Sequence, residues 1–205
     1  MFTGIVLGKG TISSIEERGE IIRLTIESPL SHTLDMGDSI CTSGVCLTVV
    51  EHTDESFAVE AIPETMRKTS LGERTISDAV NLEPSLTAET PMGGGFVTGH
   101  IDGVGTIVEF NRFDDDVILK VQIPTELMPF MAEKGSVTLD GVNLTVVNVD
   151  DTSSTITSAL IPHTLEVTTL GDRNVGDSLN VEIDVVARYV HRLLSATHAT
   201  VQASA

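Results

Sequence analysis

The sequence is poor in aromatic and basic residues, and both shortages narrow what it can do. It contains no Trp, one Tyr and six Phe, so its cores must rest mainly on Val, Ile and Leu. Twelve Lys and Arg stand against thirty Asp and Glu, which gives a net charge of -18. Because nucleic acids and anionic membranes are bound through Lys and Arg, this charge argues against either as a partner.

Long apolar runs and cysteines are also scarce. No apolar run is long enough to span a membrane, and no basic residue precedes an apolar run at the start. We therefore expect no membrane span and no signal peptide, and a cytoplasmic location. Cys41 and Cys46 could face each other across a Ser43-Gly44 turn, but without a signal peptide we expect free thiols. The six histidines are scattered, which predicts no metal site.

What the sequence does contain is a long internal repeat. The stretch SICTSGVCLTVV (Ser39 to Val50) aligns without a gap to SVTLDGVNLTVV (Ser136 to Val147), and seven of the twelve positions are identical. Flanking segments repeat in the same order: FTGIVLGKGTI with VTGHIDGVGTI, and IPETMRKTSLG with IPHTLEVTTLG. The repeat predicts two homologous domains of about a hundred residues each.

Local patterns within each copy are those of short strands. IIRLTIES and DDVILKVQI alternate apolar and polar residues, and GVCLTVV and GVNLTVV are rich in Val and Thr. Such strands are typical of a small antiparallel barrel. Between the copies, Pro91 and the glycines 93–95 predict a flexible or tightly turned link. We place the first domain at residues 1–96, the second at 97–187 and a terminal helix and tail at 188–205.

Helical spacing of apolar residues marks the C-terminal end of the chain. The residues that recur at this spacing are Val186, Val190, Leu193, Leu194, Thr197 and Val201. An amphipathic terminal helix either packs on its own domain or joins subunits, and the pattern leaves both alternatives open.

The repeated strand GVCLTVV predicts a polar surface on each copy. Successive side chains of a strand alternate faces, so Cys46 and Thr48 point away from the apolar residues between them. In the second copy Asn143 and Thr145 take these outward positions. We call Cys46 and Thr48 the first shelf, and Asn143 and Thr145 the second shelf. Two equivalent shelves suggest two similar ligands or one ligand held between them; alternatively, both threonines are ordinary solvent-facing residues.

The two copies differ at positions that could carry chemistry. The pairs that differ are Cys46 with Asn143, Ile5 with His100, Gly37 with Lys134, and Ser85 with Asp184. A lone Cys46 is often a small buried hydrophobe, and a lone His100 is often a structural residue. Asp184 could cap the terminal helix, and Lys134 could be solvated. The pattern alone leaves these alternatives open.

Taken together, these motifs resemble those of riboflavin synthases. The resemblance rests on MFTGIV, GVCLTVV, IPETMRKTSLG, TGHIDGVG, KGSVTLDGVNLTVV, and IPHTLEVTTLG with NVEID before a final helix. It covers essentially the whole chain. It implies an all-β fold of two tandem six-stranded antiparallel Greek-key β-barrels plus a C-terminal α-helix that builds a homotrimer. Substrate would lie between the first barrel of one subunit and the second barrel of its neighbour.

The resemblance also implies a reaction. Two molecules of 6,7-dimethyl-8-ribityllumazine would give riboflavin and 5-amino-6-(D-ribitylamino)uracil, the last step of riboflavin biosynthesis. This is a transferase reaction that moves a four-carbon unit and needs no cofactor or metal, because donor and acceptor are the same compound. The protein would supply positioning and proton transfer. A surrounding shell of lumazine synthase is a further partner that the sequence leaves open.

Roles for single residues follow from the same resemblance. Cys46, Ser39 or an activated water would add to the ring carbon that bears the 7-methyl group of one lumazine. His100 would remove a proton from the 7-methyl group of the other, with Thr48 and Asp184 in support. The implied substrate-binding residues are Gly4, Ile5, Val6, Cys46, Leu47, Thr48, Glu60, Ala61, Ile62, Thr65, Gly99, His100, Ile101, Lys134, Asn143, Leu144, Thr145, Ala159, Leu160, Ile161, Pro162 and Thr164.

One residue departs from the family pattern, and two other classes of protein compete. Many riboflavin synthases carry Ser where this chain has Asn143, so we expect altered affinity before lost binding. Lumazine proteins of luminous bacteria are similar over their whole length but bind a chromophore as monomers without chemistry. The presence of both Cys46 and His100 favours the enzyme. The flavin-binding barrel of reductases has no tandem copy and would need a nucleotide-binding domain for which this chain has no room.

Overall fold

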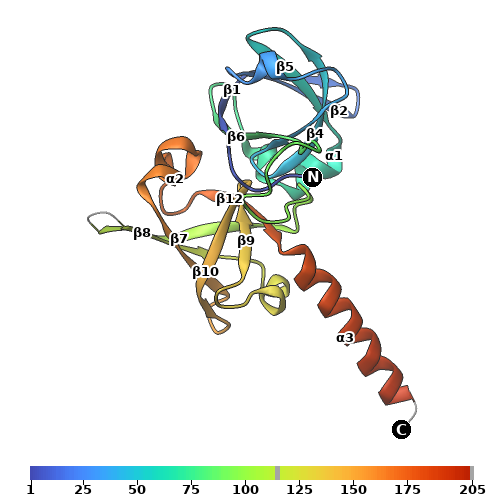
Figure 1. Cartoon of the computed structure of the whole chain (residues 1–205), viewed down its shortest axis with the longest axis vertical. Helices are drawn as coiled ribbons and strands as arrows, with labels where there is room; N and C mark the ends of the chain where they lie inside the picture. The colour runs from blue at the N-terminus through green and yellow to red at the C-terminus, as the bar shows by residue number, and fades with distance from the viewer. Residues whose placement is uncertain (114–115, 204–205) are drawn as a thin grey trace.

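Two closed β-barrels and one long helix make up the computed structural model, which describes residues 1–113 and 116–203 (Figure 1). The first barrel consists of β1 (Gly8–Arg18), β2 (Ile21–Glu27), β3 (Ser39–Thr42), β4 (Val45–His52), β5 (Ser56–Ala61) and β6 (Ala79–Pro84). The second consists of β7 (Gly103–Phe113), β8 (Asp116–Gln122), β9 (Ser136–Leu139), β10 (Val142–Asp150), β11 (Thr155–Leu160) and β12 (Ser178–Ile183). The predicted all-β fold with two six-stranded barrels is confirmed.

The barrels share one topology. Around the first barrel the order is β1-β2-β5-β4-β3-β6, and the second repeats it as β7-β8-β11-β10-β9-β12, with every pair antiparallel. The short helices repeat as well: α1 (Pro63–Lys68) with η2 (Ser70–Glu73), and α2 (Pro162–Val167) with η4 (Thr169–Asp172). Two further short helices are η1 (Ser31–Thr33) and η3 (Thr125–Phe130). Both α1 and α2 begin at a proline, whose fixed backbone angle suits the first helical position.

Strand alternation fills each barrel as the sequence predicts. In β4, Val45, Leu47 and Val49 are buried in the first core, while Thr48 is exposed and Cys46 is half-buried on the outer face. The equivalent positions of β10 behave in the same way. Aliphatic side chains dominate both cores, which fits a chain with so few aromatic residues.

Equivalent residues of the two copies meet each other where the barrels join. The backbone of Phe2 exchanges two hydrogen bonds with that of Val97, at 2.8 and 3.1 Å. The side-chain amide of Asn81 donates to the backbone carbonyl of Asp140 at 2.8 Å, and the side-chain amide of Asn180 donates to the backbone carbonyl of Ser43 at 2.7 Å. Because like meets like, the barrels are related by a local twofold axis through this contact.

A buried ion cluster at this junction breaks the twofold relation. The Asp140 side chain is fully buried and lies 3.0 Å from the Arg173 guanidinium and 3.7 Å from that of Arg74. Burial raises the pKa of Asp140, and the two arginines oppose that rise. The first copy has Ser43 at this position, so one carboxylate serves two equivalent arginines.

The terminal helix α3 (Val185–Ala203) projects away from the barrels (Figure 1). Asp184 caps it, since the backbone amide of Val186 donates to the Asp184 carboxylate at 2.7 Å. Side chains from residue 197 on, including those of Thr197 and Val201, lie outside the described residues. Within the described chain, no helix combines the length and apolarity that crossing a bilayer requires.

Candidate active site

The first shelf lies on the outer face of β3 and β4. Ser39 pairs across the strands with Thr48, and Cys41 pairs with Cys46. All four side chains therefore share the face opposite the barrel core. The two cysteines are free, as expected from the sequence, although they lie directly opposite each other.

A loop from the second half of the chain closes this shelf. The backbone amide of Cys46 donates to the carbonyl of Gly99 at 2.9 Å. Gly99 has a φ of 78°, and a Cβ there would come within 2.5 Å of the Cys46 Cβ, so the loop needs a glycine to approach this closely. His100 follows at once and is exposed beside Cys46. An open cavity of about 440 Å³ is lined by Val45, Cys46, Glu64, Thr65, Lys68, Thr69, Gly99, His100, Ile101 and Asp102.

The second shelf is closed in the same way by the start of the chain. The backbone amide of Asn143 donates to the carbonyl of Gly4 at 2.9 Å. Gly4 has a φ of 75°, and a Cβ there would lie 2.4 Å from the Asn143 Cβ. Ile5 stands where His100 stands on the first shelf. Each barrel thus carries one shelf, and the opposite barrel supplies the loop that covers it.

Two buried glutamates fix these loops. The Glu182 carboxylate accepts hydrogen bonds from the backbone amide and hydroxyl of Thr98, at 2.7 and 2.6 Å, and from the Gly99 amide at 2.9 Å. Glu83 makes the equivalent three bonds to Thr3 and Gly4. Burial raises the pKa of both carboxyls, while these hydrogen bonds pull it back down.

The catalytic candidates from the sequence fall into two groups. Ser39, Cys46, Thr48 and His100 lie together on or beside the first shelf. Asp184 is not among the residues that line the cavity of the first shelf; it follows β12, which pairs with β9 of the second barrel.

Lys134 belongs to the second barrel and is exposed. Its backbone amide donates to the carbonyl of Val146 at 2.8 Å, and its φ is 67°. The equivalent Gly37 makes the same backbone bond to Val49. Both copies therefore form the same turn, and they differ in that the second copy adds the ammonium group of Lys134.

The substrate-binding candidates divide by the direction of their side chains. Ile62 and Ile161 are 57% and 59% exposed at the ends of the strands that flank each shelf. Other candidates point into the barrel cores and could meet a ligand through their backbone alone: Val6, Leu47, Ala61, Leu144 and Leu160. Thr65 lines the cavity of the first shelf, and Thr164 takes the equivalent position in α2. All of these assignments stay predictions.

Of the two thiols, Cys46 suits a chemical role better. Burial raises the pKa of Cys41 well above its ordinary value, and the nearby Glu83 carboxylate adds to this rise. Cys41 therefore stays protonated and packs with Phe2 and Val97. A thiol needs its thiolate form to act as a nucleophile.

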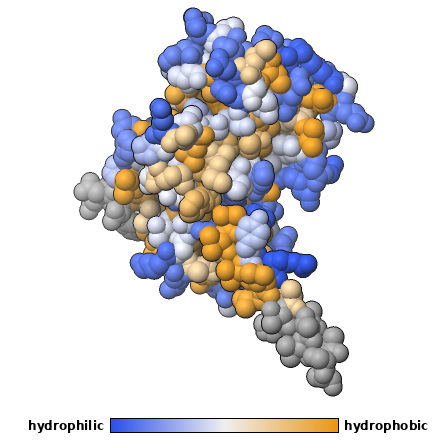
Figure 2. All heavy atoms as spheres, turned by 45° about the vertical axis from the view of Figure 1, so that its right-hand side comes forward, coloured by the Kyte–Doolittle hydropathy of each residue, from blue (hydrophilic) through white to orange (hydrophobic). Residues whose placement is uncertain are grey.

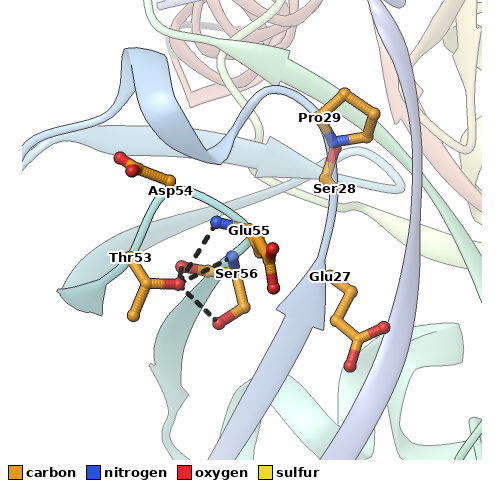
Figure 3. A pocket seen from close by; sticks show the side chains of 7 residues that line it. All are labelled: Glu27, Ser28, Pro29, Thr53, Asp54, Glu55 and Ser56. Atoms are coloured by element: carbon orange, nitrogen blue, oxygen red, sulfur yellow. Dashed lines mark hydrogen bonds between the residues drawn. The ribbon is translucent and has the colours of Figure 1, made fainter.

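Another hollow in the surface lies at the opposite end of the first barrel and carries no comparable chemistry (Figure 3). Its lining consists of Glu27, Ser28, Pro29, Thr53, Asp54, Glu55 and Ser56. The Thr53 hydroxyl accepts hydrogen bonds from the backbone amides of Glu55 and Ser56, at 3.3 and 3.0 Å. This is the cap of a hairpin turn, and its lining holds no thiol or imidazole.

The fold and the two shelves define a class of protein: a duplicated barrel with two equivalent polar surfaces, each covered by a loop from the other half of the chain. The lumazine binding domain model matches twice, at residues 3–85 and 98–184. The chain therefore belongs to the riboflavin synthase family of duplicated lumazine-binding proteins.

Named relatives agree with this membership. Riboflavin synthase of Brucella abortus is 43% identical and aligns over 94% of this chain and 98% of its own. Riboflavin synthase of Bacillus subtilis is 38% identical over 95% and 90%. A solved structure of LumP complexed with riboflavin has a TM-score of 0.81 and 26% identity, covering 89% of this chain and 99% of that one. LumP complexed with 6,7-dimethyl-8-(1'-D-ribityl) lumazine has a TM-score of 0.80.

The two glutamates that fix the loops are not among the site residues predicted from the sequence. Glu83 and Glu182 occupy equivalent positions in LEP and VEI, so an identical acid in both copies was available as a signal. A carboxylate that both copies retain within an apolar strand indicates a buried partner.

Proposed function

We propose that this protein converts two molecules of 6,7-dimethyl-8-ribityllumazine into riboflavin and 5-amino-6-(D-ribitylamino)uracil. One observation carries the proposal: a thiol and an imidazole that lie far apart in sequence meet at one of two equivalent shelves. The other shelf has the same backbone but offers an amide and an isoleucine. Two similar sites suit two molecules of one compound, and the difference between them suits a donor and an acceptor.

The proposed chemistry assigns a step to each group on the first shelf. His100 takes a proton from the 7-methyl group of one lumazine, and the resulting carbanion attacks the second lumazine. Cys46, Ser39 or an activated water adds to the ring carbon that bears the 7-methyl group of that second lumazine. The two carbon–nitrogen bonds that hold a four-carbon unit in the donor then break, the aminouracil leaves, and the unit joins the acceptor. The reaction is therefore a group transfer with no external oxidant.

We further infer that the active assembly is a homotrimer in which the first shelf of one subunit faces the second shelf of its neighbour. The support is the apolar side of α3, where Val190 and Leu193 are 49% and 68% exposed. Hydrophobic side chains gather beside the start of this helix (Figure 2). Ending the chain after Tyr189 is expected to weaken the trimer, and light scattering of the truncated protein measures this. A truncated protein with unchanged mass per particle would contradict the inference.

The experiment that tests the activity needs the purified protein and the lumazine alone. Riboflavin and the aminouracil are followed by absorbance and chromatography, and the proposal requires them in equal amounts. Tight binding with an unchanged ligand would instead make the protein a carrier of the LumP kind. Riboflavin without the aminouracil would exclude the dismutation.

A further inference from the structure

The loop that carries His100 is held at its far end by an ion pair to the terminal helix. The Asp102 carboxylate accepts two hydrogen bonds from the Arg188 guanidinium of α3, at 2.7 and 2.8 Å. The same carboxylate also accepts a hydrogen bond from the backbone amide of Ile183 at 2.9 Å. A guanidinium that binds a carboxylate through two parallel hydrogen bonds fixes both the distance and the relative orientation of the two groups.

The near end of the same loop is held by Glu182 through Thr98 and Gly99, as described above. His100 therefore lies between two fixed points of the loop, which we call clamps: Thr98, which binds the Glu182 carboxylate, and Asp102, whose own carboxylate binds Arg188. Its imidazole is exposed, so the backbone of the loop decides where the ring lies relative to Cys46.

The equivalent loop of the first copy has one clamp where this loop has two. Glu83 fixes its near end as Glu182 does here. At its far end, Leu7 takes the position that Asp102 takes in the second copy. The backbone amide of Leu7 donates to a carbonyl of β6, as that of Asp102 donates to a carbonyl of β12, but leucine has no carboxylate that could bind an arginine. The additional clamp is thus present on the loop that bears an imidazole and absent from the loop that bears Ile5.

We propose that Asp102 and Arg188 are positioning residues that fix His100 over the first shelf and couple it to α3. This inference rests on the proposed function of His100. Displacement of a catalytic group by about 1 Å can cost about a hundredfold in rate. Asp102 lines the cavity, but its carboxylate oxygens are already engaged by Arg188 and Ile183, so it acts through the loop.

The test compares Asp102→Asn, Arg188→Gln, their double variant and Arg188→Lys. Each single variant is expected to lower kcat about tenfold with KM changed less than about twofold. The double variant should be no slower than either single one, because both remove the same interaction. Arg188→Lys keeps the positive charge but cannot form the two parallel hydrogen bonds, so its kcat should lie between those of wild type and Arg188→Gln.

Asp172→Asn is the matched control, because it removes an exposed ion pair to Lys9, and neither of these residues lines the cavity of the first shelf. It should leave kcat and KM unchanged. All variants are compared at a protein concentration where light scattering gives the same particle mass. Unchanged kcat in Asp102→Asn, or a raised KM with normal kcat, would overturn the positioning role while riboflavin formation by wild type upholds the proposed function.

A second readout does not depend on turnover. The loop covers Cys46 through the bond to Gly99, so a loosened loop should expose the thiol. Alkylation of Cys46 by iodoacetamide, followed by mass spectrometry, is expected to be several times faster in Asp102→Asn, with buried Cys41 as the internal reference. If wild type forms no riboflavin, the proposed function fails, and an unchanged alkylation rate would then also reject the positioning of the loop.

Discussion

The two shelves show how a duplicated scaffold can be specialised. Their backbones agree closely: a glycine carbonyl from the opposite barrel meets the amide of Cys46 on one and of Asn143 on the other, at 2.9 Å in both cases. Their side chains differ at the residue that follows this glycine, which is His100 on one loop and Ile5 on the other. The fold thus builds the same backbone arrangement twice, and the two copies differ in the side chains that they offer there.

The largest expected effect separates the two loops. His100→Ala should lower kcat by about 10²- to 10⁴-fold, because it removes the proposed base, while lumazine binding stays nearly intact. Ile5→Ala on the other shelf removes apolar contact and should act mainly on KM. Steady-state riboflavin formation and ligand titration measure both quantities. Equal losses of kcat in the two variants would mean that the shelves do not differ in role.

The next effect concerns the asymmetric junction between the barrels. Asp140→Asn leaves Arg74 and Arg173, whose side chains are 11% and 12% exposed, without their counter-charge and should lower the free energy of unfolding by about 3 kcal/mol. Ser43→Ala removes the hydroxyl that accepts a hydrogen bond from the backbone amide of Asn81, and it should cost about 1 kcal/mol. Urea unfolding of both variants measures the difference. Similar losses would show that the two arginines do not depend on Asp140.

A smaller effect separates the shelves themselves. Cys46→Ser replaces the thiol by a weaker nucleophile and should lower kcat about tenfold if the thiol adds to the ring. Asn143→Ser removes bulk next to Gly95, where an added Cβ would lie 2.8 Å from the Asn143 amide oxygen, and should change KM about threefold. Single-turnover and steady-state rates measure both variants. Full activity in Cys46→Ser would transfer the nucleophile's role to Ser39 or water.

Much of this fold was accessible from the sequence, because a dense repeat with strand alternation reports local structure. The outward direction of Cys46 and Thr48 follows from period two alone. The sequence did not show that a loop from each half covers the shelf of the other half. A contact such as that of Gly99 with Cys46 joins distant segments, and no repeat or periodicity in the sequence relates them. The same holds for the Asp102 clamp, since a single acid after His100 does not indicate a partner 86 residues away.

The smallest effect compares the hairpin turns that precede β5 and β11. In the first barrel a neutral hydroxyl, that of Thr53, accepts the turn amides. In the second barrel the Asp150 carboxylate takes this part, and hydrogen bonds from Thr152 and Ser153 lower its pKa from 3.8 to about 2. The stability that these bonds add is present above pH 3.8 and is lost as the pH falls through about 2, so acid should loosen the second turn and spare the first.

An NMR titration of the Asp150 carboxyl carbon in the folded protein tests this difference. The wild-type midpoint should lie near 2, and Thr152→Ala should move it up toward 3.8 by removing the donor that contributes most. Thr53→Ala is the matched control in the first barrel and should leave the Asp150 midpoint where it is. A wild-type midpoint at 3.8 would mean that both turns are capped equally weakly, and that the acid sensitivity of the two barrels does not differ at this position.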